Sequence, residues 1–468
     1  RGPESTTLDA GWRCRVLYMA QNDAVLDGFT LTHGYAVNGA GVYMAGGRVQ
    51  NSIVRNNKDD GTGSGAGVWM SLGALRNCVV AGNRAGAGTY GVGRGGGVTL
   101  SGGAIENCTI SRNAAGLSEG GVYKTGGTIL NAVIHDNRAP AAPNINTSSG
   151  VTNSCAPELT GAGNITGDPR FLDVGRGYGV ALIGGNFRLG LGSSCLDAGT
   201  NVAGVFDDLD GAPRPADGDG DATAREDIGA YETQAPPADG ALRCYFDTPT
   251  NSGFVPFNPV FTAAVGGTNT NSITYFWDFD GNGTTDASSG SGTAGGAYAS
   301  PDWYTVTLTV SNAAGQTAVF TRTQYIQIPF DVAFVSPAGS HTPPYATWAT
   351  AANDIYSAVE QIGGTNNPPV YVTNGVYGIT APIVVNKGVT IRGVQGWTNT
   401  AVARLSADTR VFTLSHAAVV LDGLTISNGY VSSGYGAGIN MAGGLVRNCN
   451  IVQNLIGYGQ GGGVYMNG

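Results

Sequence analysis

The sequence predicts an all-β protein built mainly from stacked coils of short parallel strands. Three observations point to this class: a short pattern recurs every 24 to 30 residues, the segments within it alternate in polarity, and helical periodicity is almost absent. Of 468 residues, 77 are Gly and 12% are charged. A single coil cannot bury its apolar face, so such coils are stable only when they stack.

The recurring pattern is a Gly followed by apolar residues and then an Asn. It appears as Gly41 to Met44 before Asn51, Gly67 to Met70 before Asn77, Gly97 to Leu100 before Asn107, Gly121 to Tyr123 before Asn131, and Gly438 to Ile439 before Asn448. Six residues after each of these Asn residues comes a second Asn, at positions 57, 83, 113, 137 and 454. We expect the Asn amides to form ladders at the bends, while Gly permits the corners.

The residues between paired Asn residues predict strands with one buried face. The first and third positions are small or aliphatic, and the position between them varies freely, as in SIVRN, CVVAG, CTISR and AVIHD. Cys78, Cys108 and Cys449 share the first inward position with Ser52 and Ala132. We therefore interpret these cysteines as small core residues rather than disulfides.

By these G-G-V-Y and N-C-x-I coils, residues 1–152 and 392–468 resemble right-handed parallel β-helix proteins of the pectate-lyase-like superfamily. The second stretch is a near-copy of residues 1–73, displaced by 391 positions at Arg1 and by 397 at Gly41. We expect one long repeat followed by the start of the next, cut from a larger array. Copies of the chain would then be its partners along a fibre.

Residues 153–234 have a different character. The words LDAG, DLDG and DIGAYE resemble the terminal segment of secreted bacterial β-helix proteins, and we expect this stretch to include a cap for the stack. Cys155 and Cys195 stand apart from the repeats and bracket this irregular region. A disulfide between them is predicted, which would fit an oxidising, extracellular setting.

Residues 241–328 form another module. YFWDFDGNGTTD and the segment from Asp302 to Gly315 resemble the PKD domain, an immunoglobulin-like β-sandwich of secreted and surface proteins. Val306, Leu308 and Val310 alternate onto one face of the predicted strand. The sequence departs from the family's WxFGDG turn, because WDFDGNG places additional carboxylates there.

Residues 331–391 precede the second copy and contain one amphipathic pattern, over residues 348–362. Ile355, Ala358, Val359 and Ile362 fall on one side of this predicted helix. The helix and the strands after it resemble the amino-terminal cap of β-helix proteins. The predicted order is therefore β-helix, terminal segment, PKD module, cap, and the opening coils of a second β-helix.

Two acidic loops are candidate calcium sites. Asp278, Asp280, Asn282, the Thr284 carbonyl and Asp286 place oxygens at alternate positions of a Gly-containing turn, as hard cations require. A second D-x-D-x-D run consists of Asp217, Asp219 and Asp221, with Glu226 or Asp227 downstream. Its spacing is too short for an EF-hand. A solvated acidic turn without metal is the alternative for both loops.

An enzymatic function is not predicted, although the β-helix superfamily includes polysaccharide lyases and hydrolases. Such enzymes gather carboxylates on neighbouring coils. Residues 61–130 contain no Asp, and Glu106 and Glu119 lie at different positions of the repeat. Asp27 recurs as Asp422, as a structural residue would, whereas His33 is replaced by Asn428.

A binding role is suggested by an aromatic row. Tyr43, Trp69, Thr99, Tyr123 and Tyr465 share one position between inward-pointing neighbours, so their side chains should form an outward ladder. The rings could stack on sugars, shield the coils or contact a neighbouring subunit. A polysaccharide-binding or polysaccharide-cleaving β-helix protein is therefore the alternative function.

Charge and hydropathy exclude some classes of function. The net charge of -9 and the scarcity of clustered Lys and Arg argue against nucleic acid, and no apolar stretch of membrane-spanning length occurs. We expect a structural segment of a giant extracellular tandem-repeat protein, forming a surface fibre, filament or adhesin stalk. The repeating units could belong to one polypeptide or to subunits joined end to end.

Overall fold

The computed structural model describes residues 2–59, 61, 63–86, 93–219, 221–234, 241–267, 270–363, 367–379, 381–405 and 408–467. Two compact units are present: Arg1–Asp247 with Ala263–Tyr275 and Thr309–Phe320, and Thr248–Thr262 with Phe276–Leu308 and Thr321–Gly468. Strands predominate, and within the described ranges α1 (Ile355–Gln361) is the one α-helix. The all-β class is confirmed.

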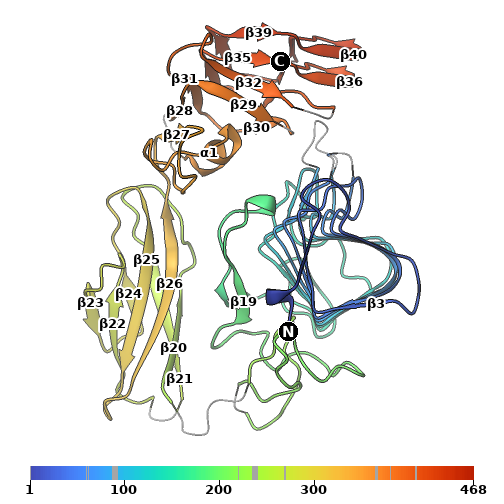
Figure 1. The fold of residues 1–468 in the computed structure, drawn as a ribbon. Coiled ribbons are helices and arrows are strands. Elements are labelled where there is room, and N and C mark those ends of the chain that lie inside the picture. Colours follow the sequence, from blue (N-terminus) through green and yellow to red (C-terminus); the bar gives the residue numbers. More distant parts are fainter. Residues whose placement is uncertain are drawn as a thin grey trace. The chain divides into compact units, whose positions relative to one another are not determined.

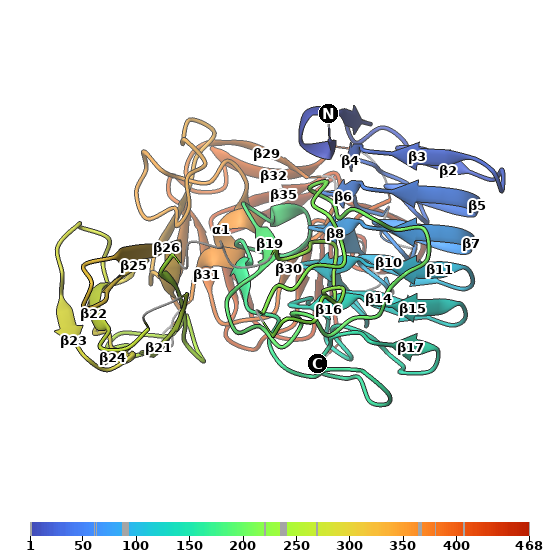
Figure 2. The same ribbon diagram turned by 90° about the horizontal axis from the view of Figure 1, so that it is seen from below.

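A parallel β-solenoid occupies the first unit. One sheet contains β1 (Thr7–Asp9), β4 (Thr30–Thr32), β6 (Ile53–Arg55), β8 (Val79–Ala81), β12 (Thr109–Ser111) and β16 (Val133–His135). The other contains β2 (Leu17–Met19), β3 (Val25–Asp27), β5 (Val42–Gln50), β7 (Val68–Arg76), β10 (Val98–Leu100), β11 (Ala104–Glu106), β14 (Val122–Lys124), β15 (Thr128–Leu130) and β17 (Val151–Thr152). Figure 2 shows their coils stacked one above another.

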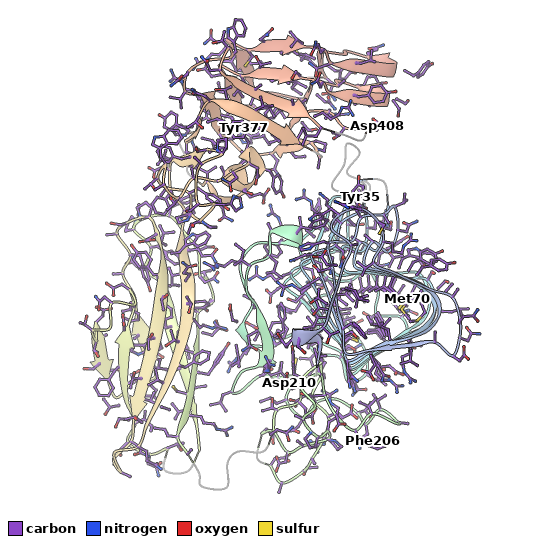
Figure 3. All side chains as sticks on the ribbon, viewed as in Figure 1. Tyr35, Met70, Phe206, Asp210, Tyr377 and Asp408 are labelled. Carbon is purple, nitrogen blue, oxygen red and sulfur yellow. The ribbon has the colours of Figure 1, made fainter. Side chains whose placement is uncertain are left out.

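The predicted repeat sets the register of these strands. Val42, Val68, Val98 and Val122 are paired in series across four coils, so the Gly-Val pattern stacks upon itself. The predicted inward positions are also confirmed, because Val54, Val80, Ile110 and Ile134 are fully buried, as are Cys78 and Cys108. Figure 3 shows Met70 pointing into the interior that the coils enclose.

The inner Asn row forms a continuous buried ladder. The Nδ2 atom of Asn57 donates to Oδ1 of Asn83 over 2.9 Å, Asn83 donates likewise to Asn113 over 2.9 Å, and Asn113 to Asn137 over 3.0 Å. Each side chain also joins backbone groups: Asn113 donates to the carbonyls of Val80 and Ser111 and accepts from the amide of Asn83. These bonds satisfy an amide group that would be costly to bury alone.

The terminal segment extends the stack and then packs along its side. Cys155 pairs with Val133 and with Ile165, which continues the first sheet beyond β16. Downstream, β18 (Phe171–Asp173) and β19 (Asn186–Leu189) form an antiparallel pair, and the 3-10 turn η2 (Gly179–Ala181) follows β18. A hydrophobic core joins this segment to the outer face of the coils. Its buried residues include Val79, Val133, Phe171, Leu182 and Ile228. The middle strand position, expected to face solvent, is therefore buried on several coils.

The strands between residues 243 and 328 form two sheets. One has the order β20 (Arg243–Asp247), β21 (Val260–Gly266), β24 (Thr293–Gly295); the other is β23 (Ala287–Ser289), β22 (Thr274–Asp278), β25 (Asp302–Ser311), β26 (Thr317–Ile328). Val306, Leu308 and Val310 are fully buried, so the predicted alternation of β25 is confirmed. Trp277 is also fully buried, and its ring centroid lies 5.7 Å from that of Phe261.

The last stretch, from residue 333, also consists of parallel ladders (Figure 1). Three follow successive sides of the coils: β27 (Ala333–Val335), β28 (Pro369–Val372), β31 (Thr390–Gly393), β34 (Val420–Asp422), β38 (Leu445–Arg447); β29 (Gly375–Ile379), β32 (Thr400–Arg404), β35 (Thr425–Ser427), β39 (Asn450–Val452); and β30 (Ile383–Val385), β33 (Phe412–Leu414), β37 (Ile439–Met441), β41 (Val464–Met466). A fourth pairs β36 (Tyr430–Tyr435) with β40 (Leu455–Gln460).

The helix before these ladders is shorter than predicted. We expected residues 348–362, whereas α1 begins after Asp354, whose Oδ1 accepts from the Ser357 amide over 2.7 Å and caps the helix. Upstream, the Thr347 and Thr350 side chains bond to local backbone and to each other, which favours a turn. The expected face is correct, because Ile355, Ala358 and Val359 are buried.

We predict that Asn113→Ala destabilises the solenoid strongly. The substitution leaves the Asn83 amide and the carbonyls of Val80 and Ser111 without their buried partner. Each of these three groups costs about 1–3 kcal/mol when left unpaired, so we expect a loss of about 3 kcal/mol or more. Denaturant unfolding, monitored by amide hydrogen exchange of the coil peptides, measures this loss of stability. Asn201→Ala, at an exposed position, is the control, and equal stability of both variants would contradict the ladder's importance.

Candidate functional sites

The predicted aromatic row is present in the first coils and is longer than expected. Tyr18, Tyr43 and Trp69 occupy paired positions, with ring centroids 5.2 and 4.4 Å apart and interplanar angles of 12° and 15°. Tyr18 was not predicted, because the short strand β2 lacks the Gly-Val signature. Thr99 interrupts the row, and beyond it the Arg94 guanidinium lies 5.0 Å from the ring centroid of Tyr123.

This stacking limits what the row can bind. A sugar binds an aromatic ring through the ring's face, but both faces of Tyr43 are occupied by its neighbours at these separations. The Arg15 guanidinium lies 4.9 Å from the Tyr43 centroid as well. In the second unit Tyr465 pairs with Asn440 in the ladder and instead stacks on Tyr435 at 4.5 Å. The geometry favours mutual stabilisation of the coils over glycan recognition.

Three acidic residues of the solenoid are engaged in structural bonds. Glu106 lies beside Arg76 on the adjoining coil, with carboxylate and guanidinium 2.6 Å apart. Glu119 accepts from the Ser118 hydroxyl over 2.5 Å. Asp59 is buried and accepts from the amides of Gly61 and Gly86. These carboxylates therefore do not converge on a common space.

A cleft of about 340 Å³ opens beside the first sheet, where Arg55 and Val79 face Leu182, Phe187 and Arg188. Among the described residues that line it, Glu4 alone carries a carboxylate. The guanidinium of Arg188 is already paired with Asp210 at 2.5 Å. Glycoside hydrolysis usually requires two carboxyl groups around one bond, so this cleft lacks that arrangement within the described chain.

The first acidic loop brings three predicted ligands together. One carboxylate oxygen from each of Asp278, Asp280 and Asp286 lies within 4.8 Å of the others. The loop also holds its own shape, because Asp278 accepts from the amides of Gly281 and Gly283 at 2.7 and 2.9 Å. Asn282 accepts from the Thr284 amide over 2.7 Å.

The second acidic group differs from the predicted one. Asp217 and Asp219 are joined by Asp197, with one oxygen from each within 4.8 Å of the others. Asp221 instead lies 3.8 Å from Arg225, and the Asp227 carboxylate accepts from the amides of Asp197 and Thr233. Burial raises the pKa of Asp227 to about 6. Sequence reasoning missed Asp197 because it is 20 positions before Asp217 in the chain.

Glu226 attaches the terminal segment to the coils. Its carboxylate accepts from Asn107 Nδ2 at 2.9 Å, from Asn131 Nδ2 at 3.2 Å and from the Val202 amide at 2.8 Å. Glu226 was offered as a possible calcium ligand, but these three bonds give it a structural role. The outer Asn residues, which adopt positive φ at the bends, thus hold the terminal segment as well as the coil.

A buried ion pair lies next to this attachment. Arg214 Nε and a Glu232 carboxylate oxygen are 3.2 Å apart, and both side chains are fully excluded from solvent. Burial raises the pKa of Glu232 to about 8, although Arg214 acts in the opposite direction. Glu232 also accepts from the amides of Ala216 and Asp227.

The two cysteines of the predicted disulfide are buried neighbours. Cys155 and Cys195 are both thiols in the structure, and their side-chain interaction, with burial, raises the pKa of Cys155 well above that of an ordinary thiol. Their proximity is compatible with oxidation to a disulfide, which remains a prediction.

No protein-family model matches this chain, and comparison with curated proteins found no match. Within the parts of the chain that the structure describes, the helix α1 is too short to cross a lipid bilayer, and no other helix is long and apolar enough to do so.

We predict that Glu232→Ala destabilises the terminal segment far more than Asp210→Ala. Each change removes the carboxylate partner of an Arg, but the Arg214 pair is fully buried whereas the Arg188 and Asp210 side chains are 38% and 39% exposed. A broken buried pair costs about 3–5 kcal/mol, and an exposed pair contributes about 0–1 kcal/mol. Denaturant unfolding of both variants tests this difference. Similar losses would mean that burial does not decide the contribution of Glu232.

Proposed function

We propose that this chain is a structural segment of an extracellular tandem-repeat fibre, in which β-helix rods alternate with PKD modules. One observation carries the proposal: the repeated sequence makes the same contacts in both places. Asp27 accepts from Asn51 Nδ2 over 2.9 Å, and Asp422, its counterpart, accepts from Asn448 Nδ2 over 2.8 Å. Strand β3 pairs with residues 48–50, just as β34 pairs with residues 445–447.

Each compact unit is closely packed where it borders the intervening module. In the first unit, a Cβ on Gly190 would lie 2.5 Å from the Tyr245 ring, so the terminal segment contacts the module's first strand directly. In the second unit, a Cβ on Gly363 would lie 2.8 Å from Pro329. Pro236 and Pro237, which precede the module, lie outside the described residues. Residues 241–328 would act as a PKD spacer, and residues 392–468 would open a second right-handed β-helix.

A non-enzymatic role agrees with the chemistry of the solenoid. The carboxylates of Glu106, Glu119 and Asp59 are occupied by an Arg side chain, a hydroxyl and backbone amides, and Tyr43 is stacked between two neighbouring rings. Both features weigh against the polysaccharide-cleaving and polysaccharide-binding alternatives. The proposed extracellular location fits the disulfide predicted between Cys155 and Cys195, which are thiols in the structure, because such a bond persists in an oxidising compartment.

We also propose that calcium binds between Asp278, Asp280 and Asp286, with Asn282 and the Thr284 carbonyl as further oxygen ligands. Three carboxylates within 4.8 Å repel one another, and a hard cation offsets this repulsion. Extracellular calcium is about millimolar, and modules outside cells bind it with dissociation constants on the order of 10⁻⁴ to 10⁻³ M. The loop follows β22, whose Trp277 is in the core, so calcium would stiffen the module.

The fibre proposal predicts a regular axial repeat. Electron micrographs of a protein with two consecutive units should show rods with a constant spacing between equivalent features, because a fibre of identical repeats presents them at one interval. Gly190→Leu should make the rods bend variably, since the added side chain meets Tyr245, while Gly290→Leu, at an open position without positive φ, should not. Randomly bent chains of beads in the parent protein would contradict the proposal and favour a flexible stalk.

The calcium proposal predicts that a chelator raises amide hydrogen exchange in residues 274–289 of the full chain, and that calcium reverses the change. Asp280→Ala should remove this response, because it deletes one of the three carboxylates. Asp331→Ala, an exposed acid outside the loop, is the matched control. Unchanged exchange on chelation in the parent protein would rule out a stabilising metal at this loop.

A further inference from the structure

Asp197 is a buried carboxylate with an unused oxygen. It is 4% exposed, and its Oδ2 accepts from the Asp219 amide over 2.8 Å, while its Oδ1 has no hydrogen-bond partner. Desolvation raises the pKa of this group. An unsatisfied charged oxygen is costly in a protein interior, so its position requires a compensating partner.

The Asp197 carboxylate belongs to a group of three converging carboxylates. Asp217 and Asp219, on the loop after Ala216, each place an oxygen within 4.8 Å of the Asp197 carboxylate. Asp197 is buried, Asp217 is half-buried and Asp219 is exposed, so the group runs from the interior to the surface. An ion could therefore enter from solvent and reach the buried oxygen.

We propose that Asp197, Asp217 and Asp219 form a second calcium site, which ties the 217–219 loop to the body of the terminal segment. Three carboxylate oxygens of differing depth suit a hard cation that tolerates irregular oxygen coordination. This site is independent of the one at Asp278 and of the fibre proposal. Its ligands do not come from one continuous acidic loop, because the buried ligand, Asp197, lies in the separate LDAG turn.

The position of Asp197 gives the site a structural consequence. Gly199 donates its amide to the Glu226 carbonyl over 2.8 Å, and Thr200 bonds through both its amide and its carbonyl to the side chain of Asn131. The turn that holds Asp197 is thus one of the parts of the terminal segment that are fixed to the coils. Calcium would extend that attachment to the loop at 217–219.

The test compares Asp197→Asn with its parent in the presence and absence of calcium. Both proteins carry Asp280→Ala, so that the Asp278 loop does not contribute. Equilibrium dialysis should find about one calcium per parent chain and none after Asp197→Asn. Calcium should also raise the melting temperature of the parent but not of the variant. When calcium is chelated, Asp197→Asn should be as stable as its parent or more stable. The neutral Asn side chain removes a buried charge, yet its oxygen still accepts from the backbone amide of Asp219.

The comparison under chelation distinguishes a ligand from a residue with a merely structural role. A structural Asp197 would make the variant less stable under both conditions, and that result would overturn the proposal. Unchanged calcium stoichiometry in Asp197→Asn, or no bound calcium in the parent, would overturn it as well. Asp217→Asn, on the more exposed side, should abolish binding too and serves if Asp197→Asn does not fold. Asp221→Asn, which removes an acid paired with Arg225 rather than a ligand, should bind calcium as the parent does.

Discussion

The buried Asn ladder is the interaction on which the rest of the first solenoid depends. Each Asn joins the next coil through its side chain and closes its own bend through backbone carbonyls, as Asn83 does toward Asn113, Val54 and Ala81. Because an amide offers two donors and two acceptor sites, the same residue type satisfies itself on every coil. A slip of one residue would bury these groups unpaired, so the ladder fixes the register of the strands.

Other rows follow from that register. Once the coils are aligned, Tyr18, Tyr43 and Trp69 must stack, and Glu106 must meet Arg76. Repetition therefore produces contacts that resemble a binding row in sequence but are occupied within the structure. Aromatic periodicity in a stacked fold is accordingly weak evidence for ligand recognition, because neighbouring coils compete with any ligand for the ring faces.

The terminal segment turns the outer surface of the solenoid into an interface. Its Glu226 bonds to Asn107 and Asn131, and Arg214 reaches Glu232 beneath it. Val79 and Val133, which would otherwise be exposed, are buried by the same segment. The segment thereby combines apolar burial with a satisfied polar network, and the acidic loop at 217–219 lies at its margin.

The sequence by itself determined the all-β class, the parallel register and the inward residues, because these depend on a short period repeated along the chain. It also identified Asp278, Asp280 and Asp286, which are neighbours in sequence and remain neighbours in space. The tertiary structure alone decided the burial of Val133, the joining of Asp197 to Asp217, and the start of α1 at Ile355, after its cap Asp354. Those features arise from contacts between distant segments or from a local cap that competes with helical periodicity. Neither distant contacts nor a single cap produces a periodic pattern in the sequence.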